Sequence, residues 1–196
     1  MNQSSDDFEA IIRQCLAGQQ AGYAMLYESC APTIYRLCYG VLMNRQDAED
    51  VMQEAFVYAF KNLRRYDAAR ASFKTWLYTI ALSRCRNLYR RGNRWNLMAL
   101  LSFDLPGPAS EAPESRYDYA DAKAAIENAL SSLSPRLREA VVLRYGHGLT
   151  FREMAEVMDC PQKTAESRVR LAHDQLRGLL RTSADNLIES LLGNEL

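Results

Sequence analysis

The chain has 196 residues, of which 48% are hydrophobic, and its formal net charge at pH 7 is zero. This hydrophobic share is sufficient for a packed core and argues against a wholly disordered chain. No apolar run approaches ~20 residues, so a membrane-spanning helix is not expected.

The chain starts with an acidic, polar stretch, MNQSSDDFEAI, which is unlike a secretory or transit peptide. Beyond it, apolar residues recur every three or four positions, which predicts an all-α fold without strands. Pro32 falls within the second helical segment and indicates either a kink or the start of a new helix. In this half, helices are expected over residues 8–16, 21–43, 47–63 and 73–91, with a loop over 64–72.

A basic block lies in the middle of the chain and is concealed by the zero average charge. Residues 61–94 hold ten basic residues and a single acid, Asp67. A block of this density is typical of a surface that binds phosphate. The ordinary alternative is a solvated helix face.

The composition changes after this block. Residues 102–116, SFDLPGPASEAPESR, hold three prolines, one glycine and several acids, which is typical of a flexible linker. The chain is therefore expected to contain two small helical domains. The predicted parts are a first domain over 1–95, a linker over 96–118, a second domain over 119–182 and a tail of unknown role over 183–196. Helices in the second half are expected over residues 120–130, from 135, over 150–158 and over 162–180, with a short apolar-faced helix in the tail.

Residues 150–176 have the spacing of a helix-turn-helix, in which a short helix, a tight turn and a longer helix follow one another. Thr150 and Glu153 are placed to form a capping box at the start of the first helix. Asp159 occupies a turn position where glycine is common, and aspartate tolerates left-handed backbone. An ordinary helical hairpin is the alternative to a DNA-binding motif.

The five cysteines include no C-x-x-C pair, and there are only two histidines, so no metal site is expected. An odd number of cysteines behind a non-secretory start indicates reduced thiols in a cytoplasmic protein. No phosphate-binding glycine-rich loop and no nucleophile–base pair is recognisable, so the chain is not expected to be an enzyme.

Three stretches resemble one family, the bacterial RNA polymerase sigma factors of the sigma-70 family, in its extracytoplasmic-function type (ECF, group IV). DAEDVMQEAFVYAFKNL, residues 47–63, looks like the helix that binds core polymerase. SFKTWLYTIALSRCRNLYRR, residues 72–91, is similar to the segment that melts the promoter and recognises the minus-ten element. Residues 133–177, starting LSPRLREAVVLRYG, are similar to the domain that binds the minus-thirty-five element.

The resemblance implies a sigma2-like four-helix domain followed by a sigma4-like helix-turn-helix domain. It also implies core RNA polymerase, promoter DNA and an anti-sigma factor as partners, no cofactor, and no direct membrane insertion. An acidic face with an amide suits a basic partner helix, although a solvated face would look the same. Asp47 is also a plausible N-cap. The residues expected to bind core polymerase are Asp47, Asp50, Gln53 and Glu54.

For the minus-ten element, the resemblance points to the loop from Tyr66 and to the helix that follows it. Melting exposes base faces that stack on aromatic rings, while lysine and arginine meet the backbone charge. Tyr66 is the best stacking candidate, whereas Trp76 is better explained as a core residue. Family members often carry asparagine where Ser83 stands, which leaves the preferred base open. The expected contacts are Tyr66, Ser72, Phe73, Ser83, Arg86, Asn87, Arg90 and Arg91.

For the minus-thirty-five element, the start of the second helix of the motif is expected to contact base edges and phosphates. Glu166 stands where the family usually has a basic residue, and it would accept from a cytosine amino group rather than bind phosphate. Arg168 has an intramolecular ion pair as its alternative role. The expected contacts are Lys163, Thr164, Glu166, Ser167, Arg168 and Arg170.

Two other functions remain open at this point. A helix-turn-helix regulator that binds an operator alone would explain residues 133–177, but it would explain neither residues 47–63 nor the basic block. A helical adaptor that binds only proteins would use the apolar stripes for partner helices. Its binding would not depend steeply on salt, whereas phosphate binding does.

Overall fold

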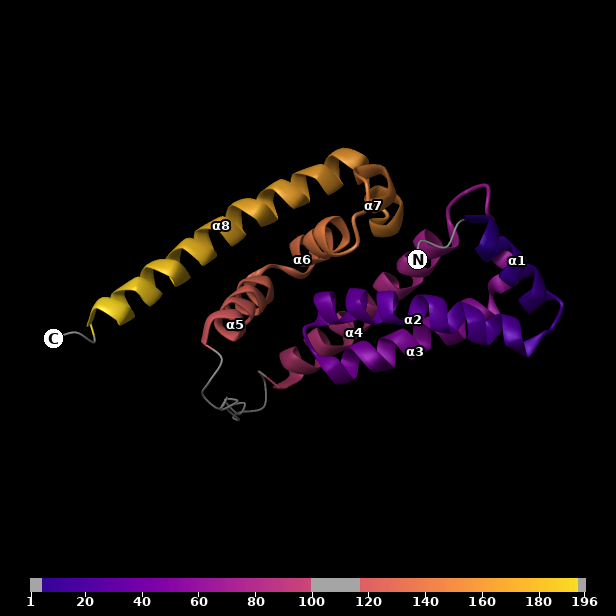
Figure 1. Ribbon diagram of the computed structural model, residues 1–196, viewed down its shortest axis with the longest axis horizontal. Helices are drawn as coiled ribbons and strands as arrows, with labels where there is room; N and C mark the ends of the chain where they lie inside the picture. The colour runs from indigo at the N-terminus through magenta and orange to yellow at the C-terminus, as the bar shows by residue number, and fades with distance from the viewer. Residues whose placement is uncertain (1–4, 100–116, 194–196) are drawn as a thin grey trace.

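The computed structural model describes the backbone of residues 5–99 and 117–193, and side chains within 8–91 and 124–180. The described residues form helices and no strand, as predicted. Figure 1 shows them as an N-terminal bundle and a C-terminal group. The helices are α1 (Ser5–Leu16), α2 (Gln20–Leu42), α3 (Arg45–Lys61), η1 (Leu63–Arg65), α4 (Phe73–Ala99), α5 (Tyr117–Ser132), α6 (Pro135–Val141), η2 (Val142–Gly146), α7 (Phe151–Met158) and α8 (Gln162–Gly193).

The N-terminal bundle is built around α2, which packs against α1, α3 and α4. One stripe of α2 is fully buried and includes Leu26, Ile34 and Leu37. The helix continues through Pro32, so the alternative of a new helix starting there is wrong. A proline inside a helix costs about 3 kcal/mol. Burial of the long apolar stripe on both sides of Pro32 offsets that cost.

α3 starts two residues earlier than predicted, and its N-cap lies three residues earlier. Asn44 is the N-cap, and its side chain accepts a hydrogen bond of 3.0 Å from the backbone N–H of Asp47. The expectation that Asp47 is the N-cap is therefore wrong. Asp47 lies instead in the first turn, where its negative charge is favourable at the positive end of the helix dipole.

The C-terminal group contains the predicted helix-turn-helix in α7 and α8. The capping box is confirmed, because Thr150 accepts from the backbone of Glu153 while the Glu153 carboxylate accepts from Thr150. Asp159 ends α7 with φ 52° and ψ 60°, so the expected left-handed turn is also confirmed. The π-helical turn η2 was not predicted.

Two other boundaries differ from the predictions. α4 extends to Ala99 rather than ending near Arg91, and most of the predicted linker lies outside the described residues. α8 runs without a break from Gln162 to Gly193, so the tail does not form the separate short helix that was expected. None of the described helices has an apolar stretch long enough to cross a bilayer.

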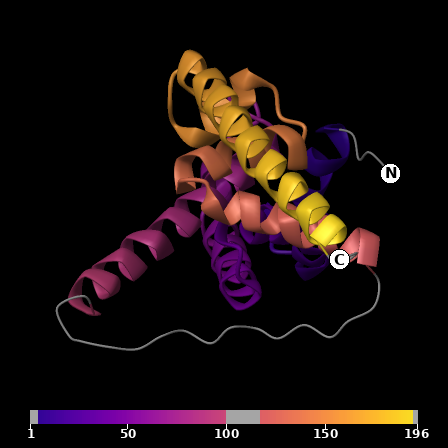
Figure 2. The ribbon, with the colours of Figure 1, turned by 90° about the vertical axis from the view of Figure 1, so that its left-hand side faces the viewer.

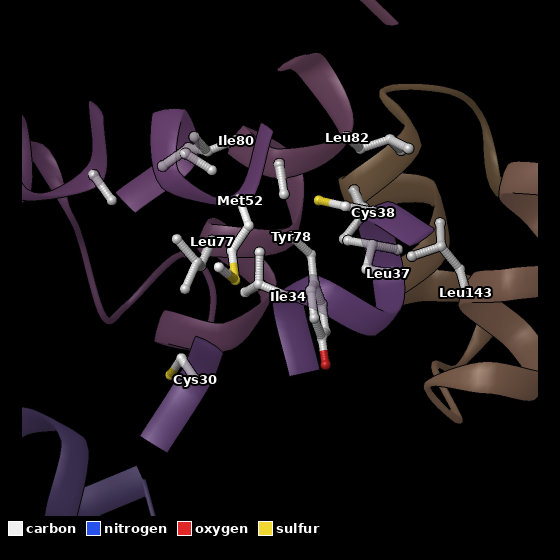
Figure 3. Packing of buried hydrophobic residues seen from close by; sticks show 14 of the residues in the cluster. Cys30, Ile34, Leu37, Cys38, Met52, Leu77, Tyr78, Ile80, Leu82 and Leu143 are labelled. Carbon is white, nitrogen blue, oxygen red and sulfur yellow. The ribbon is translucent and has the colours of Figure 1, made fainter. Parts of the chain in front are cut away.

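The two groups of helices share one hydrophobic core. α7 packs against α4, and α6 and η2 pack against α2. Leu143 from η2 is fully buried and belongs to the same cluster of buried residues as Leu37 of α2 and Leu82 of α4 (Figure 3). Figure 2, turned by 90°, shows the same arrangement, with the C-terminal helices lying over the N-terminal bundle. The structure is therefore a closed form in which the two predicted domains are in contact.

Candidate nucleic-acid and protein interfaces

The outer face of α3 carries the residues predicted to bind polymerase. Asp50, Gln53 and Glu54 are exposed, whereas Asp47 is half-buried. Alternating with this face, the buried stripe of α3 holds the helix against the bundle, which fixes the direction of the exposed side chains. The stripe consists of Ala48, Val51, Met52, Ala55, Phe56 and Ala59.

A shallow groove of about 650 Å³ runs between this face of α3 and α4. Arg84 from α4 reaches into it, 4.0 Å from the Glu54 carboxylate and with its guanidinium 4.7 Å from the centre of the Tyr58 ring. The groove thus combines carboxylates, an amide, an aromatic ring and two arginines, which suits a polar helix from a protein partner. Its lining residues are Asp50, Gln53, Glu54, Val57, Tyr58, Lys61, Arg84 and Arg91.

The predicted minus-ten residues fall into three groups. Four of them are exposed along α4: Ser83, Asn87, Arg90 and Arg91. Ser83 and Asn87 line a second pocket of about 340 Å³ together with Trp76 and Thr79. This pocket offers hydroxyl and amide groups beside an aromatic ring, which are the groups used to hold an unstacked base.

The second group forms an aromatic cluster rather than a free stacking surface. Phe73 is 2% exposed, and its ring contacts Phe8, Tyr66 and Trp76 with centroid distances of 5.5–5.8 Å. The Tyr66 hydroxyl donates to the Ala71 carbonyl at 3.1 Å, which closes the loop before α4. Burial raises the pKa of Tyr66 above its ordinary value. These rings therefore pack against one another and support the loop before α4.

Ser72 has a local structural role in the same loop. Its hydroxyl accepts a hydrogen bond of 3.1 Å from the backbone N–H of Thr75. Because the first N–H groups of a helix lack intrahelical partners, this bond stabilises the start of α4.

The third group is Arg86, whose side chain reaches the C-terminal helices. Its guanidinium donates two hydrogen bonds to the carboxylate of Glu139 on α6, at 3.0 and 2.8 Å. Glu139 is 1% exposed, and Arg136 also contacts it at 3.3 Å. A bidentate arginine–carboxylate pair of this kind is stronger than a single ionic contact and has a fixed geometry.

The predicted minus-thirty-five residues lie together at the start of α8. Lys163 and Arg170 are exposed, whereas Thr164, Ser167 and Arg168 are half-buried. Glu166 accepts from the Gln162 amide at 2.9 Å. One terminal nitrogen of Arg168 is buried and has no hydrogen-bond partner. Arg168 is in none of the ion pairs among the described residues, so the alternative role in an intramolecular pair is not found there.

Sequence reasoning missed the polar contacts that join the two halves, above all Arg138 and Glu139. Both side chains are buried, although they belong to charged residue types. A signal was present, because α6 is only seven residues long and begins at the proline of the Ser134-Pro135 pair. So short a helix packed on two sides has little exposed surface for adjacent charges.

His147 gives the closed form an expected pH dependence. Its ring packs edge-on against Tyr78 of α4 at 5.2 Å, and burial, with a smaller effect of Arg36, lowers its pKa from 6.5 to about 4. When this packing is lost, the imidazole regains its ordinary pKa and binds a proton below about pH 6.5. Acid therefore favours the unpacked form, and the stabilisation that is complete above pH 6.5 is lost progressively toward pH 4.

We expect the midpoint temperature of thermal unfolding to be lower at about pH 5 than at about pH 7. The decrease should be smaller in His147→Gln. Scanning calorimetry of both chains at the two pH values checks this expectation. Identical shifts in the two chains would mean that other groups cause the pH dependence.

Two family models match the chain in the order of its two halves. Sigma-70 region 2 matches residues 26–95, and Sigma-70, region 4 matches residues 123–176. The first match contains the α3 face and the described part of the α4 surface, and the second contains the helix-turn-helix.

Similar proteins carry related names. The chain is 32% identical over 162 residues to the ECF RNA polymerase sigma factor SigE of Mycolicibacterium smegmatis, covering 82% of this chain but only 62% of that relative. It is 29% identical to the ECF RNA polymerase sigma factor SigW of Bacillus subtilis, covering 87% of this chain and 95% of that protein.

Among solved structures, the fold is similar to that of CnrH in complex with the cytosolic domain of CnrY. The TM-score is 0.66 and the sequence identity 25%, over 91% of this chain and 99% of the other. Because the matches to region 2 and region 4 together account for more than half of its residues, the chain belongs to the sigma-70 family of RNA polymerase sigma factors.

Proposed function

We propose that this chain is an ECF sigma factor of group IV, which binds core RNA polymerase in the cytoplasm and directs it to specific promoters. The observation that carries the proposal is the presence of both regions on one chain, each with a polar surface suited to its expected partner. A regulator that binds an operator alone has no use for region 2. The polymerase performs the chemistry, and this subunit contributes binding energy for placement and strand opening.

The α3 face and the adjoining groove are the proposed docking site for core polymerase. Asp50, Gln53 and Glu54 present acid and amide groups to solvent, and Arg84 supplies a donor at the edge. Polar complementarity of this kind sets the register and orientation of a partner helix.

The exposed side of α4 is the proposed minus-ten surface. Ser83 and Asn87 would hold a base in the pocket beside Trp76, while Arg90 and Arg91 would meet backbone phosphates. The start of α8 is the proposed minus-thirty-five reader, with Lys163 and Arg170 the most accessible cations. The unusual Glu166 there favours cytosine over a phosphate contact.

Regulation by an anti-sigma factor is part of the proposal. The similar protein CnrH forms a complex with the cytosolic domain of CnrY, which supports a protein regulator for this chain as well. Such a partner would act by covering the surfaces on α3 and α4.

The test is transcription from a cognate promoter by bacterial core polymerase with and without the purified chain. We expect transcripts that require the chain and fall about tenfold or more in the double variant Gln53→Ala, Glu54→Ala, because central interface residues each contribute more than about 1 kcal/mol. Glu28→Ala on the exposed surface of α2 is the matched control and should remain active. Tight operator binding without any binding to polymerase would contradict the proposal.

A further inference from the structure

The first turn of α8 carries a polar pair within the proposed minus-thirty-five reader. The amide nitrogen Nε2 of Gln162 donates a hydrogen bond of 2.9 Å to the carboxylate oxygen Oε1 of Glu166. Gln162 is exposed and Glu166 is half-buried. Gln162 is not among the DNA contacts predicted from the sequence, whereas Glu166 is. The pair therefore adds a residue to this surface.

The position of the pair is fixed by the packing of α8 on α7. Ala165 and Val169 are buried and lie on the side of α8 that faces the core (Figure 1). The carbonyl of Pro161 accepts hydrogen bonds from the backbone N–H groups of Thr164, at 2.8 Å, and Ala165, at 3.2 Å, which orders the first turn. The two residues of the pair are four apart and are therefore neighbours on the helix surface. The helix thus presents them together, in one direction.

The partner of the Glu166 carboxylate is an amide, although two cations stand nearby on the same helix. Lys163 is three residues before Glu166 and Arg170 is four residues after it, and both spacings allow an ion pair within a helix. Among the residues whose side chains are described, Glu166 nevertheless takes part in no ion pair. The Gln162 amide therefore sets the direction of the carboxylate, and no cation of this helix neutralises it by direct contact.

A carboxylate directed at DNA needs a donor on a base. Phosphates repel it, and a hydrogen bond between neighbours on a helix surface adds little to helix stability. The major groove offers the amino group of cytosine, which is the usual donor to glutamate. Because Oε1 of Glu166 already accepts from Gln162, Oε2 is the oxygen left for this donor.

The Gln162 amide also retains hydrogen-bonding groups of its own. Its nitrogen carries two hydrogens, and Glu166 accepts one of them. The other hydrogen and the carbonyl oxygen are the groups with which a glutamine binds N7 and the amino group of adenine. An ionised carboxylate only accepts hydrogen bonds, so Glu166 keeps the nitrogen side of the amide turned toward itself.

We propose that Gln162 and Glu166 form one specificity-determining unit, in which Glu166 reads a cytosine of the minus-thirty-five element and Gln162 reads an adenine in the neighbouring base pair. Gln162 is in addition a positioning residue, because it directs the carboxylate of Glu166. Lys163 and Arg170 contribute phosphate contacts, which carry no sequence information. The inference rests on the proposed function of α8 and deepens it, since it names the bases that this reader selects.

Selection from a promoter library tests the unit. The library carries a randomised minus-thirty-five element upstream of a fixed minus-ten segment, taken from a promoter that the wild-type holoenzyme transcribes. The holoenzyme of bacterial core polymerase and the full chain is incubated with the library, and the bound fragments are sequenced. We expect the wild-type chain to prefer cytosine at one position and adenine in the neighbouring base pair, each about tenfold over the other bases.

Three variants should change this preference in different ways. Glu166→Gln keeps the shape of the side chain and should replace the selected cytosine by adenine, whereas Glu166→Arg should replace it by guanine. Gln162→Met keeps most of the length of the side chain but none of its hydrogen bonds. It should weaken both preferences about fivefold or more, while the affinity for fragments that lack these two bases stays the same.

Two further variants separate base reading from general binding. Glu28→Gln, on the exposed surface of α2, makes the same chemical change as Glu166→Gln and should leave the selected sequence unchanged. Lys163→Ala should weaken the binding of all fragments about equally and reduce its salt dependence, because a phosphate contact does not distinguish bases.

Each outcome supports or overturns a stated claim. A wild-type selection without cytosine, or one that Glu166→Gln leaves unchanged, would mean that Glu166 does not read a base. A uniform loss of affinity in Gln162→Met, with both base preferences intact, would mean that Gln162 only stabilises the start of α8. If the chain conferred no promoter binding on core polymerase at all, the proposed function itself would be contradicted, so the two failures are distinguishable.

Discussion

Replacing Arg138 by alanine is expected to lower the free energy of unfolding by about 3–5 kcal/mol. The substitution removes a buried guanidinium and takes away the donor that the carbonyls of Ser131 and Leu133 have in the structure, each at a cost of about 1–3 kcal/mol where water cannot reach them. The loss should be greatest where the halves meet, because the acceptors come from both sides of the contact.

Urea unfolding followed by circular dichroism measures this loss. Arg152→Ala is the matched control, because that arginine is exposed and its pair with Glu156 at 3.6 Å lies on the surface of α7. An exposed pair of this type contributes at most about 1 kcal/mol. If the two variants were equally stable, the hydrogen bonds of Arg138 would contribute no more than a surface contact.

Phe73→Ala should have a comparable effect, about 3–5 kcal/mol, within the N-terminal bundle. Phe73 is at the centre of the aromatic cluster formed with Phe8, Tyr66 and Trp76, and its side chain is almost completely buried. Its removal would leave a cavity below the loop that leads into α4. We also expect promoter melting to suffer, because the loop loses its support.

Comparing the thermal unfolding of Phe73→Ala and Phe73→Leu separates the effect of the lost side-chain volume from the effect of the lost aromatic ring. Leucine fills most of the cavity and should restore a large part of the stability. An alanine variant as stable as the wild type would show that the ring is not packed as described. Exposed Val57, at 53% exposure, gives a control truncation on α3.

Much of the fold follows from local pattern. The apolar spacing in α3 and α4, the capping box at Thr150 and the left-handed Asp159 are determined by neighbours in the sequence, and they were predicted. Pro32 and the start of α3 were misjudged for a physical reason. For Pro32, the proline penalty of about 3 kcal/mol is exceeded by burial along a long helix. For α3, Asn44 is as good a capping residue as Asp47, and it caps the helix three positions earlier.

The candidate site was predictable only in part. Exposed residues such as Gln53 and Ser83 follow from the polar side of an amphipathic helix. The pairing of Arg86 with Glu139 joins positions 53 residues apart, and no local pattern encodes it. The burial of Phe73 likewise depends on Phe8 from a different helix.

The junction at the end of α2 has a consequence for the N-terminal bundle itself. The last carbonyls of a helix lack intrahelical donors, and here the Val41 carbonyl receives Arg138 from the other half as well as Tyr89 from α4. The C-terminal end of α2 is thus capped in part by a residue from the other half of the same chain. Separation of the halves removes part of that cap, so the final turn of α2 should exchange its amide hydrogens faster whenever the chain opens.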